Sequence, residues 1–107
     1  MSIRQEKVAE LLKKLAAEYL VRESNTSSLI TVTRTDVASN LRRATIYFTV
    51  LPESEEDSVV EFLSRKEYDF KEYVKKHTSL QFLPITSFVL DLGEKNRIKI
   101  EELSRGE

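Results

Sequence analysis

Residues 30–51 read ITVTRTDVASNLRRATIYFTVL, and this stretch decides the fold. Near each of its ends, apolar or β-branched residues alternate with polar ones, which is the pattern of a half-buried β-strand. The alternation predicts one strand over residues 29–35 and a second over residues 44–51. Ser39 and Asn40 lie between them and supply side chains that favour turns. We therefore expect a β-hairpin with a connection longer than two residues.

One face of each predicted strand is apolar. In the first strand, Ile30 and Val32 should face the opposite side from Thr31, Thr33 and Thr35. In the second strand, the residues expected in the core are Ile46, Phe48 and Val50, and those expected on the other face are Thr45, Tyr47 and Thr49. A sheet with one apolar face needs helices or a second sheet to cover that face.

The flanking sequence supplies helices. Apolar residues at helical spacing predict an amphipathic helix over residues 1–22. An acidic turn at residues 52–57 leads into a second helix, and residues 68–77 predict a third. Residues 81–90 predict the last strand, and residues 94–103 are either a short helix or an extended docking segment.

The predicted order of elements is helix, strand, strand, helix, helix, strand. It indicates a two-layer α+β domain in which helices cover one face of a three-stranded sheet. Both later helices lie between the second and third strands, so one strand pair can be parallel. Pro84 should sit at a sheet edge or at a break in the ladder. We expect a single domain over residues 1–107, with residues 94–107 as a partly flexible C-terminal tail.

Composition excludes most enzyme classes. The 107 residues include no Cys, one His (His77) and two Gly (Gly93 and Gly106). Thiol catalysis, Cys or His metal clusters and glycine-rich phosphate loops therefore lack their residues. No set of nucleophile, base and orienting residue is visible. We expect a protein that is not an enzyme, with no cofactor, no metal and no small-molecule substrate.

Hydropathy gives no sign of a membrane protein. No segment approaches the roughly 18 consecutive apolar residues that a spanning helix needs. The first residues lack the apolar core of an export signal, so a cytoplasmic location is expected. The 17 Lys and Arg nearly balance the 18 Asp and Glu, giving a net charge of −1. That total alone argues against a globally basic nucleic-acid binder.

The hairpin residues resemble a known family. Val32-Thr33, Val37, Leu41, Ala44, Tyr47 and Val50-Leu51 follow, without a gap, the hairpin pattern of ribosome-binding factor A. In the first helix the matching residues are Arg4, Lys7-Val8, Leu11, Leu15 and Leu20. Near the end they are Pro84, Phe88, Asp91 and Lys99-Ile100-Glu101-Glu102-Leu103. The resemblance covers essentially the whole chain.

The resemblance implies a K-homology-like domain of type II topology (α-β-β-α-α-β) without the G-x-x-G loop that clamps nucleotides. The sequence indeed contains no G-x-x-G. Two departures stand out. The family's Ala-x-Gly kink between the middle helices is replaced by Lys66-Glu67-Tyr68. Residues 24–28, with no proline, stand where the family often has Asp-Pro-Arg.

The family resemblance also implies a function. It predicts a monomeric, non-enzymatic factor for maturation of the small (30S) ribosomal subunit and processing of its 16S rRNA, acting by binding rRNA. The alternative is a protein–protein adaptor that uses the same fold without direct RNA contact.

Basic residues are clustered although the total charge is nearly neutral. Phosphate binding depends on the local patch rather than on the net charge. The residues predicted to contact RNA are Arg4, Lys7, Arg42, Arg43, Lys66, Lys71, Lys75 and Lys76. The competing interpretation is that they only solvate helix faces. Among the aromatic residues, Tyr47 on the open face of the sheet is the one proposed to stack on a base.

Overall fold

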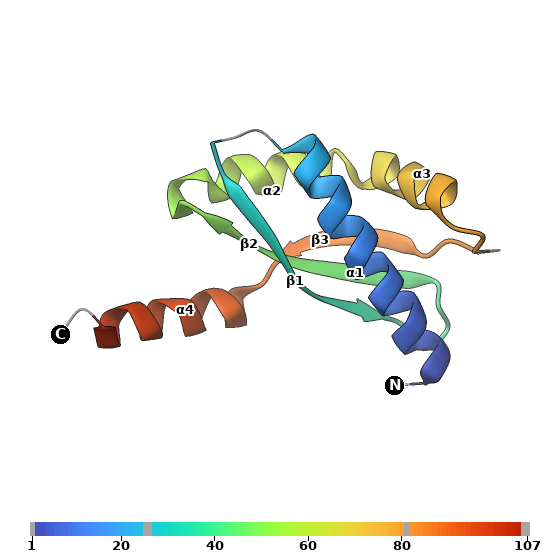
Figure 1. The fold of residues 1–107 in the computed structure, drawn as a ribbon, viewed down its shortest axis with the longest axis horizontal. Coiled ribbons are helices and arrows are strands. Elements are labelled where there is room, and N and C mark those ends of the chain that lie inside the picture. Colours follow the sequence, from blue (N-terminus) through green and yellow to red (C-terminus); the bar gives the residue numbers. More distant parts are fainter. Residues whose placement is uncertain (1, 25–26, 81, 106–107) are drawn as a thin grey trace.

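The computed structural model describes residues 2–24, 27–80 and 82–105. The elements are α1 (Ile3–Glu23), β1 (Leu29–Val37), β2 (Arg43–Leu51), the 3₁₀ turn η1 (Glu53–Glu55), α2 (Glu56–Ser64), α3 (Glu67–His77), β3 (Ile85–Leu90) and α4 (Leu92–Arg105). This confirms the predicted order and adds a C-terminal helix (Figure 1). Within the described ranges, no helix combines the length and the hydropathy needed to cross a bilayer.

The sheet has the strand order β1-β2-β3. The β1–β2 pair is antiparallel, as expected for a hairpin. The β2–β3 pair is parallel, because α2 and α3 carry the chain back between them. Pro84 lies just before β3, an edge strand, so its missing N–H breaks no ladder bond.

The strand β1 departs from the predicted alternation at Thr33. Val32 pairs with Phe48 and Arg34 with Tyr47, so Thr33 has no partner across the pair and forms a β-bulge. The extra residue shifts the alternation by one, so each later residue of β1 points to the opposite face of the sheet from the one predicted. The prediction that Thr35 faces away from Ile30 and Val32 was therefore wrong, because Thr35 is buried.

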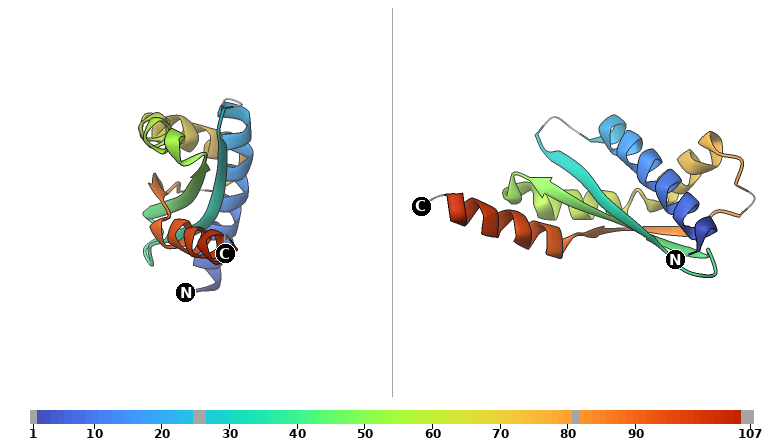
Figure 2. Two further views of the ribbon diagram at one scale, coloured as in Figure 1. Left: turned by 90° about the vertical axis from the view of Figure 1, so that its left-hand side faces the viewer. Right: turned by 60° about the horizontal axis from the view of Figure 1, so that its bottom comes forward.

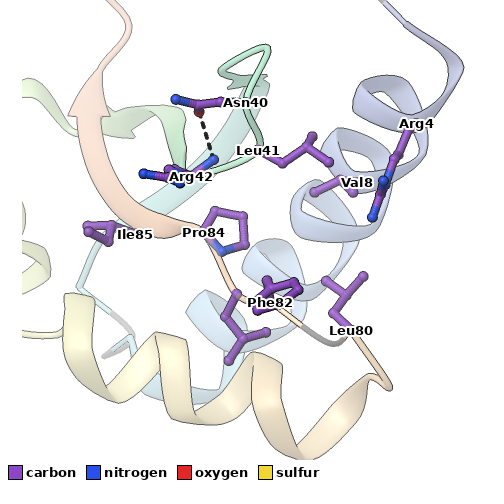
Figure 3. A pocket seen from close by; sticks show the side chains of 10 residues that line it. Arg4, Val8, Asn40, Leu41, Arg42, Leu80, Phe82, Pro84 and Ile85 are labelled. Atoms are coloured by element: carbon purple, nitrogen blue, oxygen red, sulfur yellow. Dashed lines mark hydrogen bonds between the residues drawn. The ribbon is translucent and has the colours of Figure 1, made fainter.

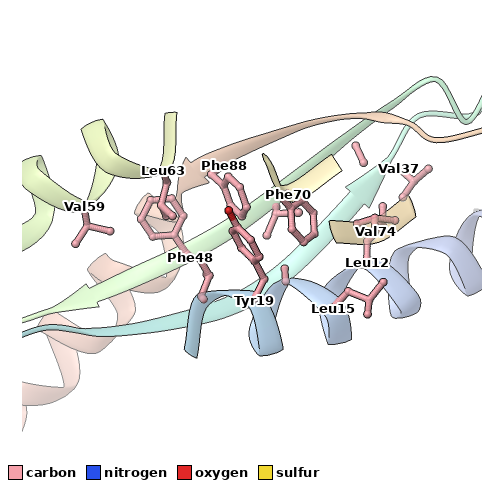
Figure 4. Close-up of a cluster of buried hydrophobic side chains, with 14 of the residues drawn as sticks. Leu12, Leu15, Tyr19, Val37, Phe48, Val59, Leu63, Phe70, Val74 and Phe88 are labelled. Carbon is pink, nitrogen blue, oxygen red and sulfur yellow. The ribbon is translucent and has the colours of Figure 1, made fainter. Parts of the chain in front are cut away.

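One core lies between the sheet and the helices α1, α2 and α3 (Figures 2 and 4). The predicted inner residues of β2 (Ile46, Phe48 and Val50) are all buried. Tyr19 from α1, Phe70 from α3 and Phe88 from β3 join them. Their rings form a row in space, in which the ring centroids of Tyr19 and Phe70, and those of Phe70 and Phe88, are each 5.3 Å apart. Tilted aromatic pairs at this spacing stabilise a core beyond the area they bury.

The joint between α2 and α3 is built without small residues. Backbone N–H groups of Arg65 and Lys66 donate to the carbonyls of Phe62 and Leu63, which ends α2. Glu67 then starts α3, and its carboxylate accepts the backbone N–H of Phe88 at 2.9 Å. The joint is therefore tied to the outer edge of β3 by a side chain.

The tail is a helix rather than an extended segment. Asp91 caps α4, since its carboxylate accepts the backbone N–H of Glu94 at 3.0 Å. The same carboxylate accepts the hydroxyl of Thr33 at 2.6 Å, which joins α4 to the bulge in β1. From there α4 runs away from the rest of the domain (Figure 1).

Candidate nucleic-acid interface

Three segments that are distant in the sequence meet at one end of the molecule. They are the start of α1, the turn between β1 and β2, and the C-terminal end of α3 with the chain that follows it (Figures 1 and 2). The acidic turn η1 and α4 lie at the opposite end. The predicted RNA-contacting residues of α1 and of the hairpin turn therefore share one end with Lys75 and Lys76 near the end of α3.

The start of α1 is fixed by a capping box. Ser2 and Gln5 each accept the other's backbone N–H, at 3.1 and 3.0 Å. The Gln5 amide also donates to the carbonyl of Val37, the last residue of β1. This bond holds the start of α1 beside β1, and Arg4 lines a pocket together with residues of the hairpin turn. The S-x-x-Q pattern at Ser2 could have predicted the helix start, and sequence reasoning missed it.

The hairpin turn holds Arg42 and Arg43 by backbone bonds. The N–H of Leu41 donates to the carbonyl of Ala38, and the N–H of Ala38 donates to the carbonyl of Arg43. The Asn40 side chain accepts the backbone N–H of Arg42 at 2.9 Å. Leu41 has a φ of 61°, in the left-handed region that non-glycine residues seldom occupy.

Seven of the eight predicted contact residues have unneutralised charges. Within the part of the chain that the structure describes, they form no ion pair with an acidic side chain. These residues are Arg4, Lys7, Arg42, Arg43, Lys71, Lys75 and Lys76. The eighth, Lys66, lies 3.4 Å from a Glu23 oxygen and only 32% of its side chain is exposed. The structure therefore sets Lys66 apart from the others, at the α2–α3 joint.

At the opposite end, basic residues are paired. Lys95 lies 3.2 Å from Glu53 and 2.8 Å from Glu56, and Lys99 lies 3.1 Å from Glu53. Arg97 pairs along α4 with two acidic residues of the same helix. The hydrogen bonds from Lys99 and Lys95 hold the pKa of Glu53 below its usual value. The net charge of −1 thus does not show how the charges are distributed: the basic residues of α4 are paired, whereas the seven predicted contact residues are not.

A pocket of about 530 Å³ opens at the cationic end (Figure 3). Arg4 and Val8 contribute to it from α1, and Leu41 and Arg42 from the hairpin turn. The chain between α3 and β3 completes the lining with Leu80, Phe82, Leu83 and Pro84. Most of these side chains are apolar, so two arginines stand beside an apolar surface. Clefts of this size and composition are typical of ligand sites.

Tyr47, the aromatic residue that the sequence analysis proposed for base stacking, has its ring covered by another side chain, whereas the ring of Phe82 is exposed. The guanidinium of Arg34 lies 3.9 Å from the centre of the Tyr47 ring and covers it on the open face of the sheet. Phe82, in contrast, is 78% exposed and lines the pocket. Sequence reasoning placed Phe82 in the third strand. Since β3 begins only at Ile85, Phe82 lies in the loop before it.

Two titratable groups with shifted pKa values, Tyr19 and Asp91, serve the fold. Burial, followed by the hydrogen bond to Asp69, raises the pKa of Tyr19 well above its usual value. The Thr33 hydroxyl and the Glu94 backbone N–H lower the pKa of Asp91. Both groups hold elements together, far from the pocket's lining. Among the described residues, no group of three or more metal-ligating side chains comes together.

Comparison with known proteins agrees with this architecture. Residues 4–104 match the family model described as ribosome-binding factor A. The ribosome-binding factor A of Macrococcus caseolyticus is 31% identical over 112 aligned residues, which cover 98% of each chain.

Solved structures share the fold. A crystal structure of ribosome-binding factor A from Thermus thermophilus superposes with a TM-score of 0.70 at 20% identity, covering 80% of this chain and 94% of that one. A homology model of the Thermus thermophilus factor, fitted into a cryo-EM map of a 30S complex, gives 0.67 at 21% identity, covering 76% and 88%. With the sequence match over nearly its whole length, the chain belongs to the ribosome-binding factor A family.

Proposed function

We propose that this chain is a non-enzymatic factor that binds the small ribosomal subunit through its 16S rRNA and assists its maturation. The observation that carries the proposal is the set of seven unpaired cations, which α1, the hairpin and α3 supply. The fitted 30S complex of the Thermus thermophilus relative supports the same partner. The protein would act as a monomer in the cytoplasm, where bacterial ribosomes are assembled.

The mechanism follows from charge and shape. Lys and Arg side chains neutralise phosphates and release counterions, which makes affinity depend steeply on salt. Phosphate contacts position a protein on RNA, and the shaped surface then favours one arrangement of RNA helices. Holding that arrangement until later steps of assembly would allow the 16S rRNA ends to be processed in order.

Sedimentation of a cell lysate through a sucrose gradient tests the partner. We expect the protein to migrate with free small subunits. Migration with polysomes, or only in the top fractions, would contradict the proposal.

Charge reversal tests the surface. The variant Arg42→Glu, Arg43→Glu and Lys75→Glu should lose small-subunit binding and most of its salt dependence. A matched control, Arg65→Glu, Arg97→Glu and Lys99→Glu, changes the net charge equally at paired residues outside the cationic end. It should retain binding. Equal binding by both variants would favour the protein–protein adaptor instead.

A further inference from the structure

The lining of the pocket at the cationic end includes an exposed aromatic ring, that of Phe82. Just before β3 the chain is held by its neighbours, since Pro84 is buried and Leu83 packs against the core. Phe82 lies between these anchors and the end of α3, yet 78% of it is exposed. A large apolar ring held in solvent indicates a binding surface more often than a packing role.

Two cations line the pocket from different elements. Arg4 belongs to α1 and Arg42 to the hairpin turn, and they lie on opposite sides of the pocket (Figure 3). Neither has an ion-pair partner among the described residues, so both guanidinium groups are available to an anion. The pocket therefore offers an apolar surface and positive charge within one space of about 530 Å³.

The pocket also contains backbone strain. Leu41 lies in its lining with a φ of 61°. Left-handed conformations of non-glycine residues are unfavourable and cluster at binding sites, where the surroundings maintain them. Here the strained turn directs Leu41 into the pocket and places Arg42 beside it.

We propose that this pocket receives one unpaired nucleotide of an RNA strand, with its base against Phe82 and its two flanking phosphates at Arg4 and Arg42. The inference rests on the proposed function and specifies which RNA feature the site takes. A nucleotide joins a flat π surface to an anion, which matches the two halves of the lining. A base inside a duplex is already stacked and cannot reach the ring, so the nucleotide must be unpaired.

Fluorescence with RNA probes tests the inference on the full chain. The probes are a short single-stranded RNA with 2-aminopurine at its centre, and the same strand annealed to its complement. We expect the emission of the single strand to change on binding, and that of the duplex to stay constant. Phe82→Ala should weaken binding of the single strand about 10-fold or more. Phe82→Tyr keeps a stacking ring and should retain binding.

A matched control separates the pocket from general loss of aromatic surface. Tyr68 is 74% exposed on α3 and does not line the pocket, so Tyr68→Ala should leave the probe's affinity unchanged. If the single strand binds Phe82→Ala as tightly as the unmodified protein, the inference is wrong while the proposed function stands. If neither probe binds and small subunits do not bind either, the proposed function itself fails. If Phe82→Ala loses small-subunit binding but not the single strand, the pocket takes a protein segment instead, which also overturns the inference.

Discussion

The carboxylate of Glu67 lies 2.9 Å from the backbone nitrogen of Phe88 and accepts its hydrogen bond. The N–H groups of Ile85 and Asp91 point toward β2 and donate to the backbone carbonyls of Arg42, just before β2, and of Phe48. Phe88 is an odd number of residues from each, so its N–H points to the free edge of β3. Glu67 thus satisfies an edge amide that no other strand of this sheet reaches.

Removing this acceptor should destabilise the fold. We expect Glu67→Ala to lower the free energy of unfolding by about 1–3 kcal/mol, because the Phe88 N–H loses its partner beside the core. Glu67→Gln keeps an acceptor oxygen and should cost less. Urea unfolding measures both. Equal stability of the alanine and glutamine variants would show that the bond contributes nothing.

Two buried threonines offer a stabilising change. The hydroxyl groups of Thr35 and Thr86 are buried and have no hydrogen-bond partner among the residues that the structure describes. Thr35→Val or Thr86→Val keeps the side chain's shape and removes the unsatisfied group, so each should raise the free energy of unfolding by about 1 kcal/mol. Thr33→Val is the contrasting control, because its hydroxyl donates to Asp91 and its loss should be destabilising. Thermal melts rank the three, and a drop in Tm for both buried-site variants would contradict the prediction.

Asp91 should make stability sensitive to acid. Hydrogen bonds, first from the Thr33 hydroxyl and then from the Glu94 N–H, hold its pKa in the folded protein below the unfolded value. The folded state therefore binds fewer protons, and this stabilisation is present above the unfolded pKa of about 3.9 and is lost as pH falls through the folded pKa. Asp91→Asn should be less stable at neutral pH and lose less stability on acidification. Urea midpoints between roughly pH 6 and pH 2 test this, and an unchanged pH slope would contradict it.

The ion pairs that join α4 to η1 should affect local order more than global stability. Ion pairs near a protein surface contribute little to global stability, because water and salt screen them. We expect Lys95→Met with Lys99→Met to change the free energy of unfolding only slightly. Hydrogen exchange should nevertheless speed up in α4, because Lys95 and Lys99 are its links to Glu53. Unchanged α4 protection would show that the Asp91 cap is sufficient.

The salt dependence of small-subunit binding should report how many phosphates the protein contacts. Removing one contact residue, as in Arg42→Gln, should weaken small-subunit binding and reduce the slope of log K against log salt by about 1. Lys66→Gln is an informative comparison. Lys66 is paired with Glu23, so we expect its loss to leave the slope unchanged. Filter-binding titrations at several salt concentrations measure both slopes.

The order of elements was readable from the sequence because each element carries its own periodicity. The inner face of β2 follows strict alternation, and Ile46, Phe48 and Val50 are all buried as predicted. The face of β1 beyond Thr33 was not readable. Threonine is equally suited to either face of a strand. The sequence of residues 31–35, TVTRT, therefore does not indicate the position of the bulge.

The cationic surface could be predicted from the sequence only in part. Runs of Lys and Arg were visible, but whether each is neutralised depends on partners distant in the sequence. Lys66 meets Glu23 only because α1 ends beside the α2–α3 joint. Likewise, nothing local reveals that Arg34 covers Tyr47 or that Phe82 is exposed, since both depend on how loops and strands meet.

The bulge at Thr33 has a consequence for solubility. β1 is an edge strand, and a regular edge presents a continuous row of unpaired N–H and C=O groups to which a strand of another molecule can add. The unpaired residue interrupts that row and increases the local twist. An incoming strand could match β1 on one side of Thr33 but would be out of register on the other. The irregularity that anchors α4 through Asp91 therefore also protects this edge against aggregation.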